Sequence, residues 1–204
     1  MISEVEVKDA MGEPPEVDAE ALTKRLADAA DAEGMLDLAY CEVDSPLGTL
    51  LAVATPEGLV KLGYPNHPFA EQLERLAAEV SPRLLEAPGR MGLDEVRREL
   101  DEYFRGERRS FDVPLDWRLT SGFVNRVLRE TARIPFGQTR SYAEMAASAG
   151  SPRAFRAAGS ALGANPIPIV VPCHRVLRSG GALGGYGGGL EVKTKLLQLE
   201  GVLS

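Results

Sequence analysis

Three short apolar runs, separated by two turns that contain proline and glycine, constrain the fold of this chain more than any other feature. The runs are LAYCEVD from Leu38, TLLAVAT from Thr49 and LVKLGY from Leu59. The intervening turns are SPLG and TPEG, at residues 45–48 and 55–58. Runs of this length between such turns are typical of β-strands. The pattern therefore predicts a three-stranded meander.

Helical patterns follow the meander. One helix is predicted near Pro68–Val80, and a second from about Leu93 to Phe104, where Gly106 is placed to end it. The segment FDVPLD, residues 111–116, predicts one more short strand. Residues 38–119 are therefore expected to form a small α/β unit.

The first 37 residues have a different composition, with eleven acidic and three basic residues. Residues 1–16 are expected to be disordered. A helical period then links the apolar residues Ala21, Leu22, Leu26, Ala29 and Ala30. This spacing predicts a short amphipathic helix within an acidic, partly disordered N-terminal extension over residues 1–37.

The sequence also indicates the cellular compartment in which the protein is expected. The N-terminus has no apolar core of a secretory signal, and no run approaches ~18 apolar residues. The two cysteines, Cys41 and Cys173, cannot form a disulfide framework, and the sequence has no Cys/His cluster with zinc-ligand spacing. A cytoplasmic protein in a reducing environment is expected, with no membrane contact, no metal and no cofactor.

Helical patterns dominate residues 120–204. An apolar face over residues 123–132 predicts one helix, which stops before a proline. Ser141 and Glu144, three residues apart, predict a capping box for a short helix over Tyr142–Ala149.

A third helix is predicted directly after this one. Ser151 would be its cap and Pro152 its first residue, and the helix would run to about Leu162. Two short helices joined by a glycine-containing turn form a helix-turn-helix pattern. The second helix would carry Arg153 and Arg156 near its N-terminus, where recognition helices place their DNA contacts.

The end of the chain contains three further segments. IPIVVPCHRV, residues 167–176, is expected to be a buried or half-buried extended segment. LRSGGALGGYGGG holds seven glycines in thirteen residues and is interpreted as a hairpin or wing that approaches another group closely. Residues 190–199 are predicted to form the final helix.

Charge is divided unevenly between the two halves. Residues 1–119 contain 13 Lys/Arg and 26 Asp/Glu, whereas residues 120–204 contain 10 Lys/Arg and 4 Asp/Glu. The net charge of −7 argues against a nucleic-acid partner, but the C-terminal half carries +6. A basic half can bind a polyanion even though the complete chain is acidic.

Cys173 lies in a setting that favours reactivity, because it precedes His174 and Arg175 and adjacent cations lower the pKa of a thiol. Adjacent residues in an extended segment point to opposite faces, so a bridging water is a more natural link to His174 than a direct hydrogen bond. His174 also needs a third group to fix its tautomer, and Glu200 is a candidate. Cys41 has no neighbouring cation and is interpreted as a core residue.

Three stretches of the C-terminal half carry a family resemblance. They are IPFGQTRSYAEMA, SPRAFRAAGSALGANPIPIVVPCHRV and GGYGGGLEVKTKLLQLEG. With PCHRV as the most specific signature, they resemble the 6-O-alkylguanine-DNA alkyltransferases, also called methylated-DNA–protein-cysteine methyltransferases. The opening SPLGTLLAVAT resembles the N-terminal domain of that family, so the resemblance covers roughly residues 38–202.

The resemblance implies a small ribonuclease H-like α/β domain over residues 38–119. A helical, winged-helix-like domain over residues 120–204 would follow, with the DNA-binding helix-turn-helix and the active site. The implied function is DNA repair by direct reversal. One methyl or alkyl group would pass from the 6-oxygen of guanine, with the 4-oxygen of thymine as a second candidate, to Cys173, once per chain. The implied partner is double-stranded DNA containing alkylated guanine, bound by a monomer.

The resemblance also implies roles for individual residues. Cys173 would be the nucleophile, His174 its base through a water, and Glu200 the group that orients His174. Tyr142 would press on the 3′ phosphate and protonate guanine N3, while Arg156 would fill the gap left by the flipped nucleotide. The implied DNA contacts are Arg156, Tyr142, Arg153 and Ser179, and the implied base pocket contains Asn165, Val176, Tyr186, Gly187 and Lys193.

Two positions depart from the family pattern. Phe155 stands beside Arg156 where a small residue is usual, and Gly187 stands where some members have a serine. Phe155 and the acidic extension keep open a non-catalytic, alkyltransferase-like protein that flags lesions, although Cys173 argues against it. Two further alternatives fit these residues less well. A thiol hydrolase would require a direct Cys173–His174 hydrogen bond, which their adjacency disfavours. A plain winged-helix regulator would not require a reactive cysteine.

Overall fold

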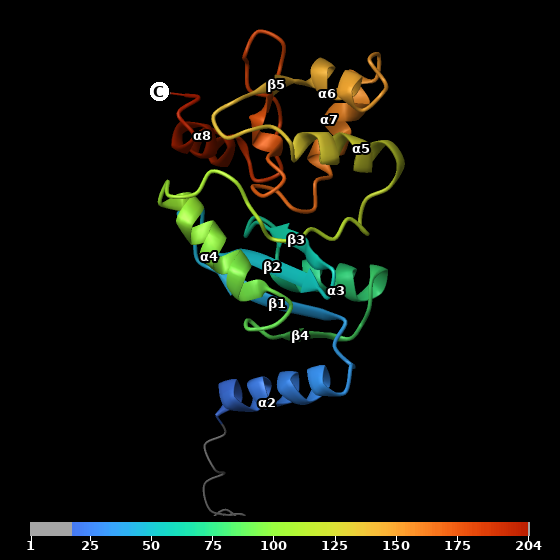
Figure 1. Ribbon diagram of the computed structural model, residues 1–204, viewed down its shortest axis with the longest axis vertical. Helices are drawn as coiled ribbons and strands as arrows, with labels where there is room; N and C mark the ends of the chain where they lie inside the picture. Colours follow the sequence, from blue (N-terminus) through green and yellow to red (C-terminus); the bar gives the residue numbers. More distant parts are fainter. Residues whose placement is uncertain (1–17, 204) are drawn as a thin grey trace, which may run out of the picture.

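The computed structural model describes residues 18–203. The predicted disorder of residues 1–16 lies outside the described residues. Figure 1 shows a sheet with flanking helices in the N-terminal half, and a group of short helices and loops in the C-terminal half. This arrangement confirms the predicted fold class. Among the described residues, no helix is both long and apolar enough to cross a membrane.

The N-terminal half is built on a four-stranded sheet. Its strands are β1 (Leu38–Val43), β2 (Leu50–Thr55), β3 (Gly58–Gly63) and β4 (Leu84–Glu86), in the spatial order β3-β2-β1-β4. Strands β1, β2 and β3 pair antiparallel, so the predicted meander is confirmed. Strand β4 lies parallel to β1 and was not predicted from the sequence.

Helices α3 (Phe69–Glu79) and α4 (Leu93–Phe104) cover the sheet and confirm two predicted helices. Every residue of β2 is buried, because alternate side chains enter two different clusters. Leu51 packs in the cluster that contains Leu76 of α3, whereas Leu50 packs in the cluster that contains Leu100 of α4. The sheet is therefore a layer between the two helices.

The segment 111–116 does not form the predicted strand. It makes an isolated bridge between Leu115 and Leu59, beside β3. The Leu59 N–H donates to Pro114 O at 2.8 Å, and the Asp116 N–H donates to Leu59 O at 2.9 Å. Proline has no amide hydrogen, so a continuous ladder cannot extend through Pro114.

The helix predicted within the N-terminal extension is present as α2 (Ala19–Ala32). Its residues Ala27 and Ala30 are buried, and Asp28 forms an ion pair with Arg90, which follows β4. Helix α2 lies beside β4, at the end of the molecule opposite to the C-terminal half (Figure 1).

The C-terminal half is a cluster of short helices. Helices α5 (Gly122–Thr131), α6 (Tyr142–Ser148) and α7 (Phe155–Gly163) pack against one another, and α8 (Leu190–Leu199) ends the fold as predicted. The predicted capping box is also present at the start of α6. The Glu144 N–H donates to Ser141 Oγ at 3.2 Å, and the Ser141 N–H donates to Glu144 Oε2 at 2.6 Å.

Helix α7 begins three residues later than predicted, at Phe155 instead of Pro152. Residues 151–154 form a turn in which the Ala154 N–H donates to Ser151 O at 2.9 Å. A Ser-Pro pair suits a β-turn as well as a helix start, and packing decides between them. Arg153 therefore lies in the turn, and Arg156 lies in the first turn of the helix.

The segment 167–176 is not extended, contrary to the prediction. It contains turns and one 3-10 turn at Cys173–Arg175, and it leads into the short strand β6 (Val176–Leu177). Strand β6 pairs parallel with β5 (Arg140–Ser141). Pro168 and Pro172 each lack an amide hydrogen, which prevents a continuous ladder along the segment.

The glycine-rich segment forms a loop, and residues 178–189 contain no paired strands, so of the two predicted forms, a hairpin or a wing, the hairpin is absent. The expected close approach is present. A Cβ atom on Gly184 would meet the Tyr142 hydroxyl at 2.1 Å, and one on Gly188 would meet the Tyr64 ring at 2.8 Å. The loop is thus pressed against an aromatic side chain from each half of the molecule.

Candidate active site

Cys173 lines a cavity of about 380 Å³ between the two halves of the molecule. The thiol residue is buried, with 7% of its surface exposed. The lining residues from the C-terminal half include Cys173, Asn165, Tyr186 and Gly187, and those from the N-terminal half include Lys61, Tyr64, Asn66, Gln72 and Arg75. Both halves therefore surround the thiol.

Asn165 holds the thiol in place. Its Nδ2 donates to Cys173 Sγ at 3.1 Å and to Val171 O at 2.8 Å, while its Oδ1 accepts from the Ile167 N–H at 3.0 Å. Burial raises the pKa of the Cys173 thiol, and the hydrogen bond from Asn165 and the charge of Lys193 oppose this effect. The thiol is therefore protonated at neutral pH, and a reaction through sulfur requires a base.

Cys41 contrasts with this arrangement. It is buried in β1, and burial raises its pKa to about 11. Among residues 18–203, no side chain or backbone group donates a hydrogen bond to the Cys41 sulfur. This fits the interpretation of Cys41 as a core residue.

A buried carboxylate fixes the imidazole of His174. His174 is fully buried, and its Nε2 lies 2.8 Å from Glu200 Oε1. Burial alone would raise the pKa of Glu200, but hydrogen bonds from His174 and Arg175 hold this pKa at about 2. Glu200 is thus ionised at neutral pH and only accepts hydrogen bonds, so Nε2 of His174 carries the proton.

The other ring nitrogen of His174 remains an acceptor. Nδ1 is buried and has no hydrogen-bond partner among residues 18–203. Burial lowers the pKa of His174, so the ring is neutral at neutral pH. A neutral imidazole with a free lone pair on Nδ1 has the form that a general base requires.

Two buried cations complete the site. Arg175 donates to Glu200 from Nε and from Nη2, each at 2.8 Å. Lys193 of α8 is fully buried, and its Nζ donates to Val176 O at 2.6 Å. Helix α8 thus delivers Lys193 and, directly after its end, Glu200 to the same site.

The glycine-rich loop is tied to the N-terminal half beside the cavity. The hydroxyl groups of Tyr186 and Tyr64 lie 2.7 Å apart, and Asn66 Nδ2 donates to Gly187 O at 3.0 Å. These contacts fix the wall of the cavity that faces Cys173.

A second hollow, the outer hollow, lies between α6, α7 and the glycine-rich loop. Its lining includes Tyr142, Arg156, Gly159, Ser179, Tyr186 and Gly187, and the last two also line the first cavity. Arg156 is exposed and lies over the ring of Phe155, at 5.6 Å from the centroid. Phe155 itself is 48% exposed.

The structure brings nearly all the predicted site residues to these two hollows or to the cluster around His174. Of the residues predicted to contact DNA or the base, three line neither hollow. Arg153 is exposed in the turn before α7, and Val176 and Lys193 are buried and hydrogen-bonded to each other. Sequence reasoning missed Tyr103, whose hydroxyl donates to Glu200 Oε1 at 2.7 Å across 97 residues of sequence. It also missed the ion pair of Arg175 with Glu200. The CHR run was a signal for Arg175, but nothing in the local pattern distinguishes Tyr103 from a core residue.

Known proteins resemble this chain over both halves. The family model for the 6-O-methylguanine DNA methyltransferase DNA binding domain matches residues 122–202, and the model for the ribonuclease-like domain matches residues 38–117. A methylated-DNA–protein-cysteine methyltransferase of Mycolicibacterium paratuberculosis is 44% identical over 161 residues, which cover 79% of this chain and 91% of that protein. The inducible methylated-DNA–protein-cysteine methyltransferase of Bacillus subtilis is 42% identical over 147 residues, covering 72% and 81%.

Solved structures agree with the sequence relatives. The crystal structure of Mycobacterium tuberculosis OGT in complex with DNA is similar to this chain with a TM-score of 0.69 and 39% identity, covering 79% of this chain and 92% of that one. The ranges matched by the family models include Cys173, His174 and Glu200. The chain belongs to the 6-O-methylguanine DNA methyltransferase family.

Proposed function

We propose that this protein repairs DNA by direct reversal, transferring a methyl or alkyl group from the 6-oxygen of guanine to Sγ of its own Cys173, once per chain. The observation that carries the proposal is a buried thiol next in sequence to a neutral His174 with a free Nδ1. The names of the relatives, methylated-DNA–protein-cysteine methyltransferases, support the same reaction. The 4-oxygen of alkylated thymine is a second candidate substrate.

The reaction needs a thiolate and a proton for the departing guanine. His174 Nδ1 takes the thiol proton through a bridging water, and the ionised Glu200 stabilises the imidazolium that forms. Sγ of Cys173 then forms a bond to the alkyl carbon as the bond from that carbon to the guanine oxygen breaks. The electron pair of the broken bond passes to guanine, and Tyr142 donates a proton to N3. Burial raises the pKa of Tyr142, which keeps its hydroxyl protonated before this step.

In this proposal the alkylated base lies beside Cys173, where Tyr186 and Gly187 line both hollows. Asn165, which holds the thiol, and Tyr186 and Gly187, which also line the cavity, would contact the base. Lys193 would act by fixing the carbonyl of Val176, the third residue after Cys173. The thioether formed on Cys173 is chemically stable, so each chain would react once.

The outer hollow would bind the DNA backbone. A base stacked in a duplex cannot reach a buried thiol, so it must be flipped at a cost of a few kcal/mol. Arg156 would fill the resulting gap, and Tyr142 and Ser179, which line the same hollow, would contact the adjacent strand. Arg153, in the preceding turn, would contact a phosphate. The positive charge of residues 120–204 supports this binding mode.

Several features of the whole protein belong to the same proposal. Residues 38–119 and 120–204 would be the two structural domains, with residues 1–37 as an extension. The protein would act as a cytoplasmic monomer on double-stranded DNA that contains alkylated guanine. The lesion-flagging alternative is not favoured, because Cys173 is present with a base and the relatives are named as methyltransferases.

Intact-protein mass spectrometry tests the proposal. After incubation with a duplex that contains 6-O-methylguanine, the mass should increase by one methylene per chain. The variants Cys173→Ala and Cys173→Ser should bind the same duplex without a mass increase. Tight binding by the wild-type protein without a mass increase would contradict the proposal and favour lesion flagging. Transfer by either variant would contradict the assignment of Cys173 as nucleophile.

A further inference from the structure

A tyrosine from the N-terminal half contacts the carboxylate of Glu200. Tyr103 lies near the end of α4 and is fully buried. Its hydroxyl donates to Glu200 Oε1 at 2.7 Å. The same oxygen lies 2.8 Å from His174 Nε2 and accepts from Arg175 Nη2 at 2.8 Å. One carboxylate oxygen therefore connects α4 to the imidazole.

The ring of Tyr103 is held by three aromatic neighbours. Its centroid lies 5.4 Å from that of Phe104, 5.3 Å from that of Phe111 and 6.2 Å from that of Phe136. A buried tyrosine hydroxyl needs a hydrogen-bond partner, and a backbone carbonyl would satisfy that need. Here the partner is instead a carboxylate that also holds His174, which points to a role in the site.

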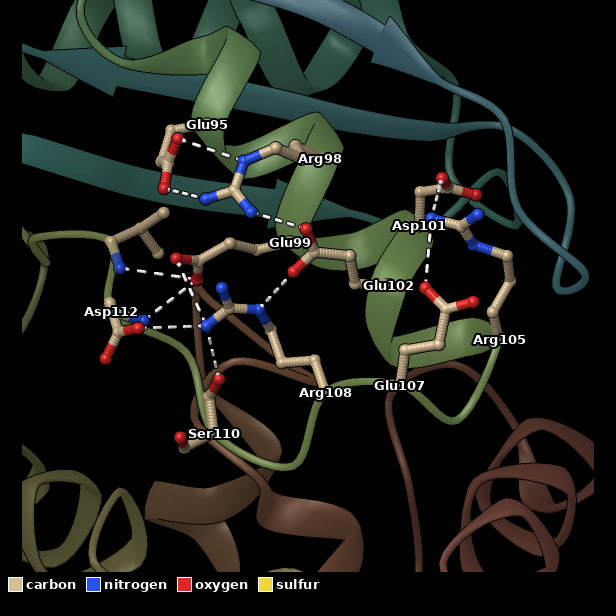
Figure 2. A network of polar contacts seen from close by, with 11 residues as sticks. Glu95, Arg98, Glu99, Asp101, Glu102, Arg105, Glu107, Arg108, Ser110 and Asp112 are labelled. Atoms are coloured by element: carbon tan, nitrogen blue, oxygen red, sulfur yellow. Dashed lines mark hydrogen bonds and ion pairs between the residues drawn. The ribbon is translucent and has the colours of Figure 1, made fainter.

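Polar contacts fix α4 against the segment that leads into the C-terminal half. Glu99 of α4 is fully buried, and its Oε2 accepts from the Asp112 N–H at 2.8 Å. Arg108 forms ion pairs with Glu102 at 2.8 Å and with Asp112 at 3.0 Å. Figure 2 shows these contacts joining α4 to residues 108–112. Because Tyr103 lies on this anchored helix, the N-terminal half determines where its hydroxyl lies.

The titratable and charged groups around His174 come from four parts of the fold. They are Cys173 and Arg175 of the 3-10 turn, Lys193 and Glu200 of α8 and its end, Tyr186 of the glycine-rich loop, and Tyr103 of α4. Of these groups, Glu200 accepts a hydrogen bond from the ring, and Tyr103 donates a hydrogen bond to the same oxygen of Glu200.

We propose that Tyr103 is a positioning residue, whose hydroxyl holds Glu200 in place and thereby sets the orientation and basicity of His174. Only the kinetic consequence of this inference rests on the proposed function. In the Tyr103→Phe variant, Oε1 of Glu200 loses a donor and keeps its negative charge. The carboxylate then stabilises the imidazolium more strongly, so the pKa of His174 rises.

Histidine NMR tests the inference, because the chain contains two histidines, His67 and His174. In the wild-type protein, the ring-nitrogen shifts of His174 should report a neutral ring protonated at Nε2. In Tyr103→Phe, the pKa of His174 should rise by about half a unit. The exposed His67 gives a second set of ring signals in the same spectra and is the internal reference. An unchanged His174 titration in folded Tyr103→Phe would overturn the proposal.

Two control variants separate positioning from packing. Tyr40→Phe removes a hydroxyl from β1, in the same half of the molecule but not in contact with Glu200. Phe111→Leu disturbs the aromatic cluster around Tyr103 and leaves its hydroxyl in place. Both should keep the wild-type pKa of His174. An equal shift in Phe111→Leu would overturn the proposal, because packing alone would then account for it.

The alkyl-transfer rate gives a second readout. Tyr103→Phe should transfer the methyl group about tenfold more slowly than wild type, because Glu200 loses a strong hydrogen bond and no longer holds the His174 ring in the orientation that takes the thiol proton. The acidic limb of its rate–pH profile should move to higher pH, in step with the pKa of His174. An unchanged rate and profile would contradict the proposal. If the wild-type protein transfers no methyl group, the proposed function fails, and the NMR titration alone decides the role of Tyr103.

Discussion

Phe155 and Arg156 are neighbours at the start of α7, and both are exposed beside the outer hollow. Arginine suits the gap left by a flipped nucleotide, because its planar guanidinium can stack and also contact phosphate. Phe155 presents an apolar ring where the family pattern has a small residue. The guanidinium of Arg156 lies over this ring, and both residues line the outer hollow.

The Arg156→Ala variant tests whether Arg156 fills the gap left by the flipped nucleotide. It should lower the rate of transfer from a duplex by at least about tenfold, because the cost of the flipped state is no longer offset. Its effect on transfer from a free alkylated base should be small, because no flipping is needed. Arg153→Ala is the matched control and should lower duplex repair less, since Arg153 lies outside the hollow. Equal losses on the duplex and the free base would contradict a flipping role for Arg156.

Helix α6 illustrates how a single element positions a site residue. Its capping box fixes the first turn, and Tyr142 is the first residue of that turn. Tyr142 then packs against Gly159 of α7 and Gly184 of the glycine-rich loop. The cap therefore determines where the Tyr142 hydroxyl enters the hollow.

Ser141→Ala should destabilise the protein by about 1 kcal/mol, because the Glu144 N–H loses its acceptor at the helix start. Urea unfolding followed by circular dichroism measures this loss. Ser148→Ala, at the exposed end of α6, should leave the unfolding midpoint within error and is the control. Equal stability of Ser141→Ala and wild type would show that packing alone fixes α6.

Within the whole molecule, Glu200 joins the two halves, because it accepts hydrogen bonds from Tyr103 of the N-terminal half and from Arg175 of its own half. Its pKa of about 2 in the folded state is below the ordinary 4.5. A carboxyl with a lowered folded-state pKa adds stability above its unfolded pKa, and this stability is lost as the pH falls from 4.5 toward 2.

The urea midpoint of the wild-type protein should therefore fall between about pH 5 and about pH 3. Glu200→Gln should be less stable at neutral pH, since it leaves a buried Arg175 without its anion, and its midpoint should depend less on pH. Glu191→Gln, an exposed change on α8, should keep most of the wild-type pH dependence. Identical pH dependence in wild type and Glu200→Gln would contradict this account.

The described part of the acidic N-terminal extension lies far from the outer hollow in the whole molecule (Figure 1). Helix α2 lies at the end of the molecule opposite to α6 and α7 (Figure 1), so it does not cover the outer hollow. Deletion of residues 1–34 removes ten acidic and three basic residues. It retains the buried Leu36, and also Asp37, which bonds Arg83.

This truncated protein should transfer methyl groups at least as fast as the full chain, because less negative charge opposes DNA association. The difference between the two proteins should vanish at high salt, where the charges are screened. A truncated protein that is folded and inactive would show that the extension takes part in the reaction.

By itself, the sequence determined the features that depend on near neighbours along the chain. Apolar runs between Pro/Gly turns determined the meander, and Ser141 with Glu144 determined the cap of α6. The sequence Cys-His-Arg at residues 173–175 identified Cys173 as a candidate nucleophile. Each of these patterns acts within a few residues, so local physics is sufficient. The start of α7 and the conformation of residues 167–176 were predicted wrongly, because Ser-Pro and proline-rich segments allow several local conformations.

Only the tertiary structure decided which distant groups meet at the thiol. Asn165 reaches Cys173 Sγ because the chain turns at residues 167–172 instead of extending. Tyr103 reaches Glu200 across 97 residues because the tertiary fold places the end of α4 beside the residue that follows α8. The tautomer of His174 follows from the contact with Glu200, since the ionised carboxylate accepts a hydrogen bond from Nε2–H and leaves Nδ1 free. No local pattern encodes such contacts, because they depend on how two separately patterned halves bury their surfaces against each other.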